Sequence, residues 1–401
     1  MINKTDNICF MQDKFQRVTD KNNVGNTNVL TISAQHGLIN QFEYYNHQYA
    51  SENTSGYTLL HKGDFAYNKS YSDGYPWGAT KRLERYDSGV VSPLYICFAA
   101  KDGVCADFYS YYFESEPFYR EIYKIAQEGA RNHGLLNVAT EDFFKIRIAN
   151  PPLEEQRRIA EILGCCDRVI ALKKELIAEK KKQKKALMQK LLNPDSGFRL
   201  PGFSGEWRKV YVSDVSELLT GYPFASENFS LTGTKLLRCS NVKRGVLDWE
   251  PSITVYWNNC ENLDEFQLQA GDIVIAMDGA LVGYSFSQIT PDDLPMLLVQ
   301  RVARLRSTGI CQDYLAHCII NPAFGEHIER VKTDTAIPHM SPKDILGYAF
   351  YMPTYAKEQQ AIADILSAAD KEIDLLEQEL AQQEQKKKSL MQLLLTGIVR
   401  V

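Results

Sequence analysis

Side chains that can donate several hydrogen bonds gather on apparent loops in two widely separated parts of the chain. Arginine, lysine and asparagine can reach the edges of nucleic-acid bases, while hydroxyl and further basic groups suit phosphates. In the first part the candidates are Tyr67, Asn68, Lys69, Ser70, Tyr71, Lys81, Arg82, Arg131, Asn132 and His133. In the second part they are Arg238, Ser240, Asn241, Lys243, Arg301, Thr333, Thr335 and His339. The pattern predicts two nucleic-acid contact regions; the alternative for each residue is a surface loop with ordinary ion pairs.

Motifs for catalysis on nucleic acid are absent from the sequence. There is no Gly-x-x-x-x-Gly-Lys-Ser/Thr phosphate loop. There is no Asn/Asp-Pro-Pro-Tyr/Phe methyltransferase motif, since residues 150–153 read Asn-Pro-Pro-Leu, and there is no nuclease-like cluster of carboxylates and lysine. Because these motifs are missing, we expect no catalytic residue, cofactor site or metal site in this chain.

Asp278 is a further polar residue of the second part. It could accept a hydrogen bond from a cytosine amino group or cap a turn, and we favour the turn.

Length and composition set the outer bounds. The chain has 401 residues, 44% of them hydrophobic, and a net charge of −5, which is typical of two or three globular domains. No apolar run approaches the ~20 residues that cross a bilayer, and the polar first residues lack a signal-peptide core. We expect a cytoplasmic protein without membrane contact. The nine scattered cysteines lack the spacing of a zinc site and are interpreted as reduced core residues.

Positive charge is concentrated in one segment. Residues 154–192 hold 11 Lys and Arg against 6 Asp and Glu. Residues 1–153 hold 15 against 17, and residues 193–355 hold 13 against 19. Neither large segment has the basic excess of a free-standing nucleic-acid-binding domain, so contact must depend on local clusters or on partners that supply positive charge.

An internal repeat organises the chain. Residues 155–192 align without a gap on residues 358–395, and 17 of the 38 positions are identical. The stretches before each copy show almost no such identity. We therefore predict four parts: a first domain at residues 1–150, a first helix at 151–195, a second domain at 196–352 and a second helix at 353–401.

Each repeat copy is predicted to be one long coiled-coil helix. Apolar and long side chains recur in alternating steps of three and four, which is a heptad pattern. The predicted seams are residues 163, 166, 170, 173, 177, 180, 184, 187 and 191, and residues 366, 369, 373, 376, 380, 383, 387, 390 and 394. The first copy is rich in lysine where the second is rich in glutamate, which favours antiparallel pairing. The alternative is a lysine-rich face that meets only solvent.

The two large segments are predicted to be mixed α/β domains with one shared fold. Strand-like runs occupy residues 28–33, 90–98, 272–276 and 297–303. The turn and strand at residues 63–68 parallel those at 271–276, and residues 136–142 parallel residues 338–344. The two domains therefore look like diverged copies.

Taken together, these features resemble the specificity subunit of a type I restriction-modification enzyme. The motifs that carry the resemblance lie at the start of each helix (Pro151-Pro-Leu-Glu-Glu-Gln156 and Lys357-Glu-Gln359), at its end (residues 184–192 and 387–395) and in the second domain (Pro201-Gly-Phe203 with Glu206-Trp207, Gly271-Asp272 and residues 335–341). One departure is that no Gly-Phe-x-x-x-Trp opening precedes the first domain, so its first strand is expected to be short or replaced.

The resemblance implies a fold and a set of partners. The fold would be α+β: two similar target-recognition domains joined by two long antiparallel coiled-coil helices with pseudo-two-fold symmetry. The chain would bind double-stranded DNA at a bipartite site, one half per domain. Methyltransferase (modification) subunits and motor-endonuclease (restriction) subunits would dock on it, and S-adenosylmethionine, ATP and Mg would belong to those partners.

Two rival interpretations remain open at this point. A free-standing DNA-binding regulator with two domains would explain the duplication, but it should be basic and carry a helix-turn-helix signature, which the sequence lacks. A purely structural coiled-coil scaffold would explain the helices but not the divergence of the two large domains.

Overall fold

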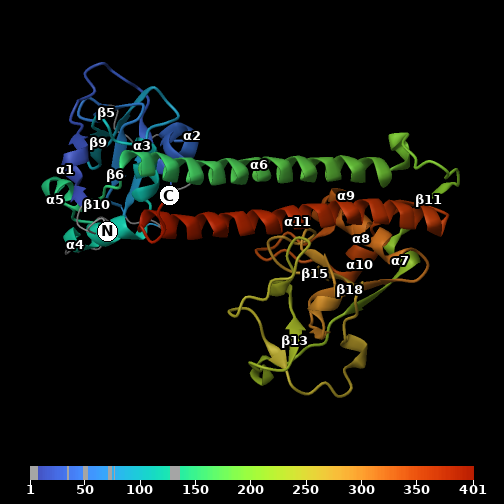
Figure 1. Cartoon of the computed structure of the whole chain (residues 1–401). Coiled ribbons are helices and arrows are strands. Elements are labelled where there is room, and N and C mark those ends of the chain that lie inside the picture. Colours follow the sequence, from blue (N-terminus) through green and yellow to red (C-terminus); the bar gives the residue numbers. More distant parts are fainter. Residues whose placement is uncertain (1–7, 34–35, 48–52, 71–74, 76, 127–135) are drawn as a thin grey trace. The chain divides into compact units, whose positions relative to one another are not determined.

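The chain divides into two compact units. The computed structural model describes residues 8–33, 36–47, 53–70, 75, 77–126 and 136–401. Unit 1 comprises Met1–Lys174 and Gln378–Val401, and unit 2 comprises Glu175–Glu377. Two long helices, α6 (Leu153–Leu191) and α11 (Ala356–Leu395), contribute residues to both units (Figure 1). In the part of the chain that the structure describes, no helix is long and apolar enough to cross a membrane.

Unit 1 is built on a four-stranded antiparallel sheet in the order β2 (Phe15–Arg17), β9 (Ile96–Ala100), β6 (Phe65–Asn68) and β7 (Ala79–Arg82). Three antiparallel pairs accompany it: β1 (Ile8–Phe10) with β10 (Arg147–Ala149), β3 (Leu30–Ser33) with β4 (Gly37–Asn40), and β5 (Thr58–His61) with β8 (Ser88–Val91). The helices outside the repeat are α1 (Met11–Lys14), α2 (Gln41–Tyr45), α3 (Ala106–Tyr112), α4 (Glu116–Ile125) and α5 (Thr140–Phe144).

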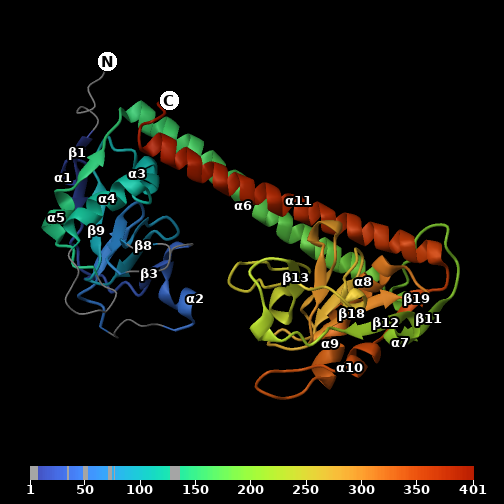
Figure 2. The ribbon, with the colours of Figure 1, turned by 90° about the horizontal axis from the view of Figure 1, so that it is seen from below.

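A core of aromatic side chains packs between the four-stranded sheet of unit 1 and its helices. Phe15, Phe65 and Phe98 come from three strands and are fully buried. These three rings pack against one another and against Tyr109 of α3 and the adjacent Phe113, in edge-on, tilted and stacked pairs at ring-centroid distances of 5.0–5.8 Å. Figure 2 shows α3 and α4 beside this sheet. Large apolar rings on alternate strand positions thus form one continuous core.

Unit 2 repeats the same plan. Its four-stranded antiparallel sheet has the order β12 (Ser216–Thr220), β18 (Val302–Ser307), β15 (Ile273–Ala276) and β16 (Phe286–Gln288). A second sheet orders β14 (Tyr256–Trp257), β13 (Thr234–Leu237) and β17 (Met296–Leu298), and β11 (Trp207–Tyr211) pairs with β19 (Ala349–Pro353). The helices are α7 (Val212–Val215), α8 (Gln312–Ile320), α9 (Pro322–Val331) and α10 (Pro342–Leu346), with five short 3-10 turns, η1 (Pro194–Ser196), η2 (Ser226–Asn228), η3 (Cys239–Asn241), η4 (Asp264–Phe266) and η5 (Pro291–Asp293).

The shared layout of the two domains is confirmed in detail. The turn before the central strand holds Gly63 in unit 1 and Gly271 in unit 2, at φ values of 100° and 91° that favour glycine. The next residue caps that turn in both units: Asp64 accepts from the His61 amide at 2.7 Å, and Asp272 accepts from the Gln269 amide at 2.8 Å. The two four-stranded sheets are therefore one fold in two copies.

Two of the predicted strands are each split in two. Residues 90–98 form the end of β8 and the start of β9, because Pro93 lies in a turn in which the Tyr95 amide donates to the Ser92 carbonyl. Residues 297–303 divide between β17 and β18 at Arg301, whose φ of 73° breaks the extended backbone. The predictions at residues 28–33 and 272–276 match β3 and β15.

The predicted seams are confirmed, since every seam position of α6 and α11 is buried or half-buried. Each unit shows the two helices running antiparallel. In unit 1, Asp167 pairs with Lys387 and Lys173 with Glu379, both at 2.6 Å. In unit 2, the pairs are Lys180 with Glu372 at 2.6 Å, and Lys184 with Asp370. Three of these four pairs join a lysine of the first helix to a carboxylate of the second, as the charge pattern predicted, and Asp167–Lys387 has the opposite polarity.

Candidate nucleic-acid interface

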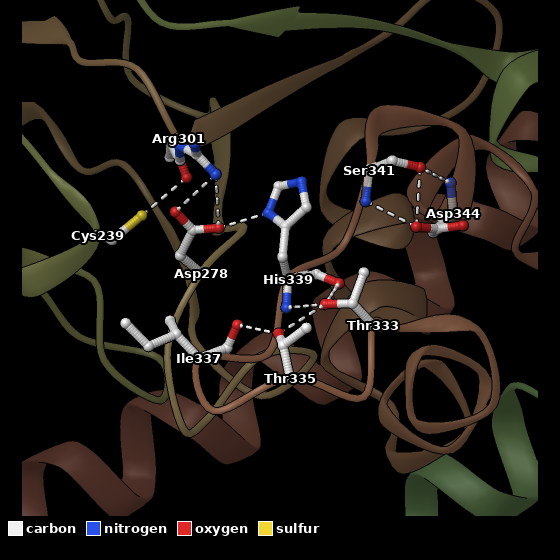
Figure 3. A network of polar contacts seen from close by, with 9 residues as sticks. All are labelled: Cys239, Asp278, Arg301, Thr333, Thr335, Ile337, His339, Ser341 and Asp344. Atoms are coloured by element: carbon white, nitrogen blue, oxygen red, sulfur yellow. Dashed lines mark hydrogen bonds and ion pairs between the residues drawn. The ribbon is translucent and has the colours of Figure 1, made fainter.

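Three polar side chains from separate segments of unit 2 meet in one group, which we term the Asp278 cluster (Figure 3). Asp278 follows β15, Arg301 precedes β18, and His339 lies before α10. The Asp278 carboxylate accepts from His339 Nδ1 and lies 3.3 Å from Arg301 Nη1. The side chains of Asp278, Arg301 and His339 are 24%, 55% and 33% exposed. A carboxylate thus orients two groups that solvent can reach.

The backbone beneath Arg301 is held from two sides. Its carbonyl accepts from the Met277 amide at 2.9 Å and from the Cys239 thiol at 2.8 Å. Burial raises the pKa of the Cys239 thiol, which keeps the sulfur protonated as a donor. These contacts stabilise the left-handed backbone of Arg301, which is uncommon for a residue with a side chain.

The loop that leads to His339 is closed by its own hydrogen bonds. The Thr333 amide donates to the His339 carbonyl at 2.9 Å, and the His339 amide donates to Thr333 Oγ1 at 3.0 Å. Thr335 Oγ1 donates to the Ile337 carbonyl at 2.7 Å. Thr333, Thr335 and Ile337 are exposed. The sequence-predicted residues Arg301, Thr333, Thr335 and His339 therefore lie in one region of unit 2.

Three of the other four candidates of unit 2 have hydrogen-bond or ion-pair partners within the unit. Asn241 is fully buried, accepts from the Arg238 amide at 3.1 Å and donates to the Asp248 carbonyl at 2.9 Å, so the prediction that it contacts a base is wrong. The Arg238 guanidinium donates to the Ile253 carbonyl and lies over the Phe229 ring. Ser240 and Lys243 are exposed, with Lys243 Nζ 3.7 Å from Asp248.

In unit 1, the corresponding place at the end of the central strand holds Asn68, Lys69 and Ser70. Asn68 Oδ1 accepts from the Ser70 amide at 3.0 Å. Lys69 lines a cavity of about 160 Å³ together with Arg17. Burial and the Arg17 charge lower the pKa of Lys69. Two cations therefore share the place where unit 2 has the Asp278 cluster.

Tyr67 was predicted on a loop with these residues, and that placement is wrong. It lies in β6, is fully buried and stacks on Phe143 at 5.1 Å. Its hydroxyl donates to the Trp77 carbonyl at 2.8 Å. The strand alternates sides, so Tyr67 points into the aromatic core.

Lys81 and Arg82 lie in strand β7 rather than on a loop, and both are engaged in ion pairs. Lys81 pairs with Glu114; burial would lower its pKa, but the carboxylate outweighs burial and the pKa is raised. Arg82 donates to Glu84 at 2.6 Å and to Asp107 at 2.5 Å. For these two residues the structure favours the alternative of structural ion pairs.

Four predicted contact residues lie outside the described residues: Tyr71, Arg131, Asn132 and His133. They remain predictions.

Sequence reasoning missed Arg17 and Cys239 and assigned Asp278 to a turn cap. Arg17 ends strand β2, and Asp278 pairs with residues 23 and 61 positions away. The folded structure brings these residues together from distant parts of the chain, and no spacing within one segment indicates that they meet. Among the described residues, no group of three or more His, Cys, Asp and Glu side chains could hold a metal ion.

Comparison with known proteins agrees with the duplicated fold. The chain matches the Type I restriction modification DNA specificity domain twice, over residues 9–181 and 204–385. It is 28% identical over 324 residues to the type I restriction enzyme MjaVIII specificity subunit of Methanocaldococcus jannaschii, which covers 78% of this chain and 75% of that protein. Since the family match spans most of the chain, the protein belongs to the type I restriction-modification DNA specificity family.

Two solved structures share the fold. The crystal structure of the type I restriction-modification S subunit from M. genitalium has a TM-score of 0.60 at 14% identity and covers 98% of each chain. A chain from a structure on complex assembly and conformational transition of the type I R-M system has a TM-score of 0.57 at 17% identity, covering 97% of this chain and 96% of that one.

Proposed function

We propose that this chain is the DNA-recognition subunit of a type I restriction-modification complex, in which each unit reads one half of a bipartite DNA site. One observation carries the proposal: the same sheet is present twice, but the equivalent strand ends present different side chains. Unit 2 presents Asp278, Arg301 and His339, and unit 1 presents Lys69 and Arg17. The same sheet in two copies, with different polar side chains at the strand ends, suits two recognition domains that bind different DNA sequences.

The chemistry would belong to partner subunits. The family match and the absence of phosphate-loop and methyltransferase motifs from the sequence support a chain without catalytic residues. Methyltransferase subunits would modify the bound site, and motor-endonuclease subunits would cleave unmodified DNA. S-adenosylmethionine, ATP and Mg would then be bound by those subunits, and double-stranded DNA by this one. The family match favours this role over a free-standing regulator.

The negative charge of the whole chain fits such a division of labour. At a net −5 the free chain gains little from the attraction between basic protein and DNA phosphates. Partner subunits would supply positive charge, and this chain would supply base contacts. Tight DNA binding is therefore expected of the complex and weak binding of the isolated chain.

The test is to map methylated bases genome-wide in cells that express this chain with its methyltransferase subunit, and in matched cells without this chain. We expect methylation at two short specified sequences separated by an unspecified gap, and its loss without the chain. Methylation that persists unchanged without the chain would contradict the proposal.

A further inference from the structure

We propose that Asp278 is a positioning residue that holds Arg301 and His339 so that the pair reads one guanine–cytosine base pair in the major groove. The inference rests on the proposed function and names one base pair in the half-site of unit 2. It follows from the charge balance of the Asp278 cluster, from the hydrogen-bonding capacity of its two solvent-facing groups, and from the way the backbone holds them.

The charge balance separates base reading from phosphate binding. Phosphate sites need excess positive charge, because the ligand is an anion. In the Asp278 cluster the Arg301 guanidinium lies 3.3 Å from a carboxylate that also bonds His339. That carboxylate offsets the arginine charge and would repel a phosphate. A neutral base edge, which offers only partial charges, meets no such repulsion.

Arg301 determines which base fits. The guanidinium presents parallel N–H donors, and in the major groove guanine alone offers two acceptors, O6 and N7, on one edge. One nitrogen of Arg301 faces Asp278, and the side chain is 55% exposed, so donors remain for a ligand. Arginine held by a carboxylate therefore favours guanine.

His339 supplies the complementary group. A carboxylate accepts hydrogen bonds but does not donate them, so the proton of the neutral ring lies on Nδ1, which faces Asp278. The other ring nitrogen, Nε2, is then an acceptor. In the major groove the partner of guanine presents the N4 amino donor of cytosine. The Arg301 donors and the His339 acceptor lie next to each other, so together they match the acceptors of guanine and the amino donor of its cytosine partner.

The backbone makes the arrangement rigid before DNA arrives. Asp278 and His339 form a short antiparallel bridge, and the Met340 amide donates to the Met277 carbonyl at 3.0 Å. The Arg301 carbonyl is fixed by Met277 and by Cys239. Preordering lowers the cost of immobilising side chains on binding. Asp278 thus acts through Arg301 and His339 rather than by touching DNA.

The experiment maps methylated sites for the full chain with its methyltransferase subunit. Exchange of residues 196–352 for those of a relative first identifies the half-site that unit 2 reads. We expect that half-site to contain a required guanine. Arg301→Ala and Arg301→Lys should each lower the preference for it by about ten- to a hundredfold, because lysine keeps the charge but loses the paired donors.

Asp278→Asn keeps the size of the side chain but removes its charge. We expect it to relax the preference at that same base pair and at no other position. Arg330→Ala is the matched control, since Arg330 lies in α9 of the same unit and donates to the Glu326 carbonyl of its own helix. It should keep the full wild-type motif. Thermal unfolding of each variant checks that unit 2 remains folded.

The possible outcomes are distinct. Loss of specificity at a single guanine in all three variants supports the inference. A half-site without a required guanine–cytosine pair, or unchanged preferences in Arg301→Ala, overturns it while the bipartite site still stands. Relaxation spread over every position in Asp278→Asn would show a structural role only and would also overturn it. If no methylated motif depends on this chain, the proposed function itself fails.

Discussion

Two buried glutamines tie the long helices to the domains that precede them. Gln359 Oε1 accepts from the Cys311 amide at 2.9 Å, and its Nε2 donates to the Pro353 carbonyl at 2.9 Å. Its repeat Gln156 makes the same two bonds, to the Cys105 amide at 3.3 Å and the Pro151 carbonyl at 2.8 Å. These identical residues of the repeat are therefore kept in the same structural role.

Gln359→Leu should destabilise unit 2. The change leaves the half-buried Cys311 amide and the buried Pro353 carbonyl without their partner, each at a cost of about 1–3 kcal/mol. Denaturant unfolding of the full chain measures the loss. The matched control is Gln360→Leu, because Gln360 is exposed and solvent can replace its side-chain bonds to Asp364 and to the Cys311 thiol. Equal stability of the two variants would show that the Gln359 bonds contribute nothing.

In unit 1 the neighbours Tyr67 and Lys69 should respond in opposite ways. Lys69→Ala should weaken DNA binding by the complex and lower the slope of log affinity against log salt by about one, as expected for one phosphate contact. Tyr67→Phe should leave binding unchanged and cost about 1 kcal/mol of stability, because it loses its bond to Trp77. Salt-dependent binding and thermal unfolding distinguish the two. A Lys69→Ala complex with unchanged affinity would remove this residue from the candidate site.

At the scale of the helices, the ion pairs follow the internal repeat. Asp167 pairs with Lys387, and their repeat equivalents Asp370 and Lys184 also pair. Other pairs have no such symmetry: Lys174 meets Glu384 at 2.8 Å, and Lys181 meets Glu377 at 2.7 Å. The repeat equivalents of Glu384 and Glu377 are Lys181 and Lys174.

This asymmetry predicts how a half-length chain pairs with itself. Two copies of residues 1–197 in the same register would place Lys174 of one copy opposite Lys181 of the other, twice per dimer. Pairing should therefore be weak. Lys174→Glu should tighten the fragment dimer by about 1–2 kcal/mol, since two repulsions become two attractions of a few tenths of a kcal/mol each. In the full chain the same change places a second carboxylate opposite Glu384 and should lower stability slightly.

Sedimentation of the fragment at low and moderate salt measures the effect. Lys182→Glu is the control, because Lys182 lies 3.8 Å from Glu179 of its own helix and is 79% exposed. It should leave dimerisation almost unchanged. A Lys174→Glu fragment that pairs no better than wild type would contradict the symmetric register.

Features that depend on neighbouring residues of one segment could be predicted from the sequence, and features that depend on contacts between distant residues could not. The helices, their seam and their antiparallel sense could be predicted, because heptad spacing and charge are written along one segment. The splits at Pro93 and Arg301 were missed, because an apolar run does not show where its backbone turns. The Asp278 cluster could not be predicted, since its members meet only through the pairing of β15 with β18 and through a separate loop that carries His339. Asn241 was misjudged because burial depends on the whole unit.

For the chain as a whole, we propose that one duplicated fold carries two independent recognition sites. Each unit has its own four-stranded sheet, its own core and its own set of exposed polar side chains at the equivalent strand ends. Since no residue of the candidate site in one unit is needed to build the site in the other, the two half-sites should be separable.

The most direct test is to replace residues 196–352 with the equivalent segment of a relative and to map methylated bases in cells that also express the methyltransferase subunit. We expect one half of the methylated motif to change to that of the relative while the other half stays the same. A chimaera that methylates a motif changed in both halves, with the fold intact, would contradict it.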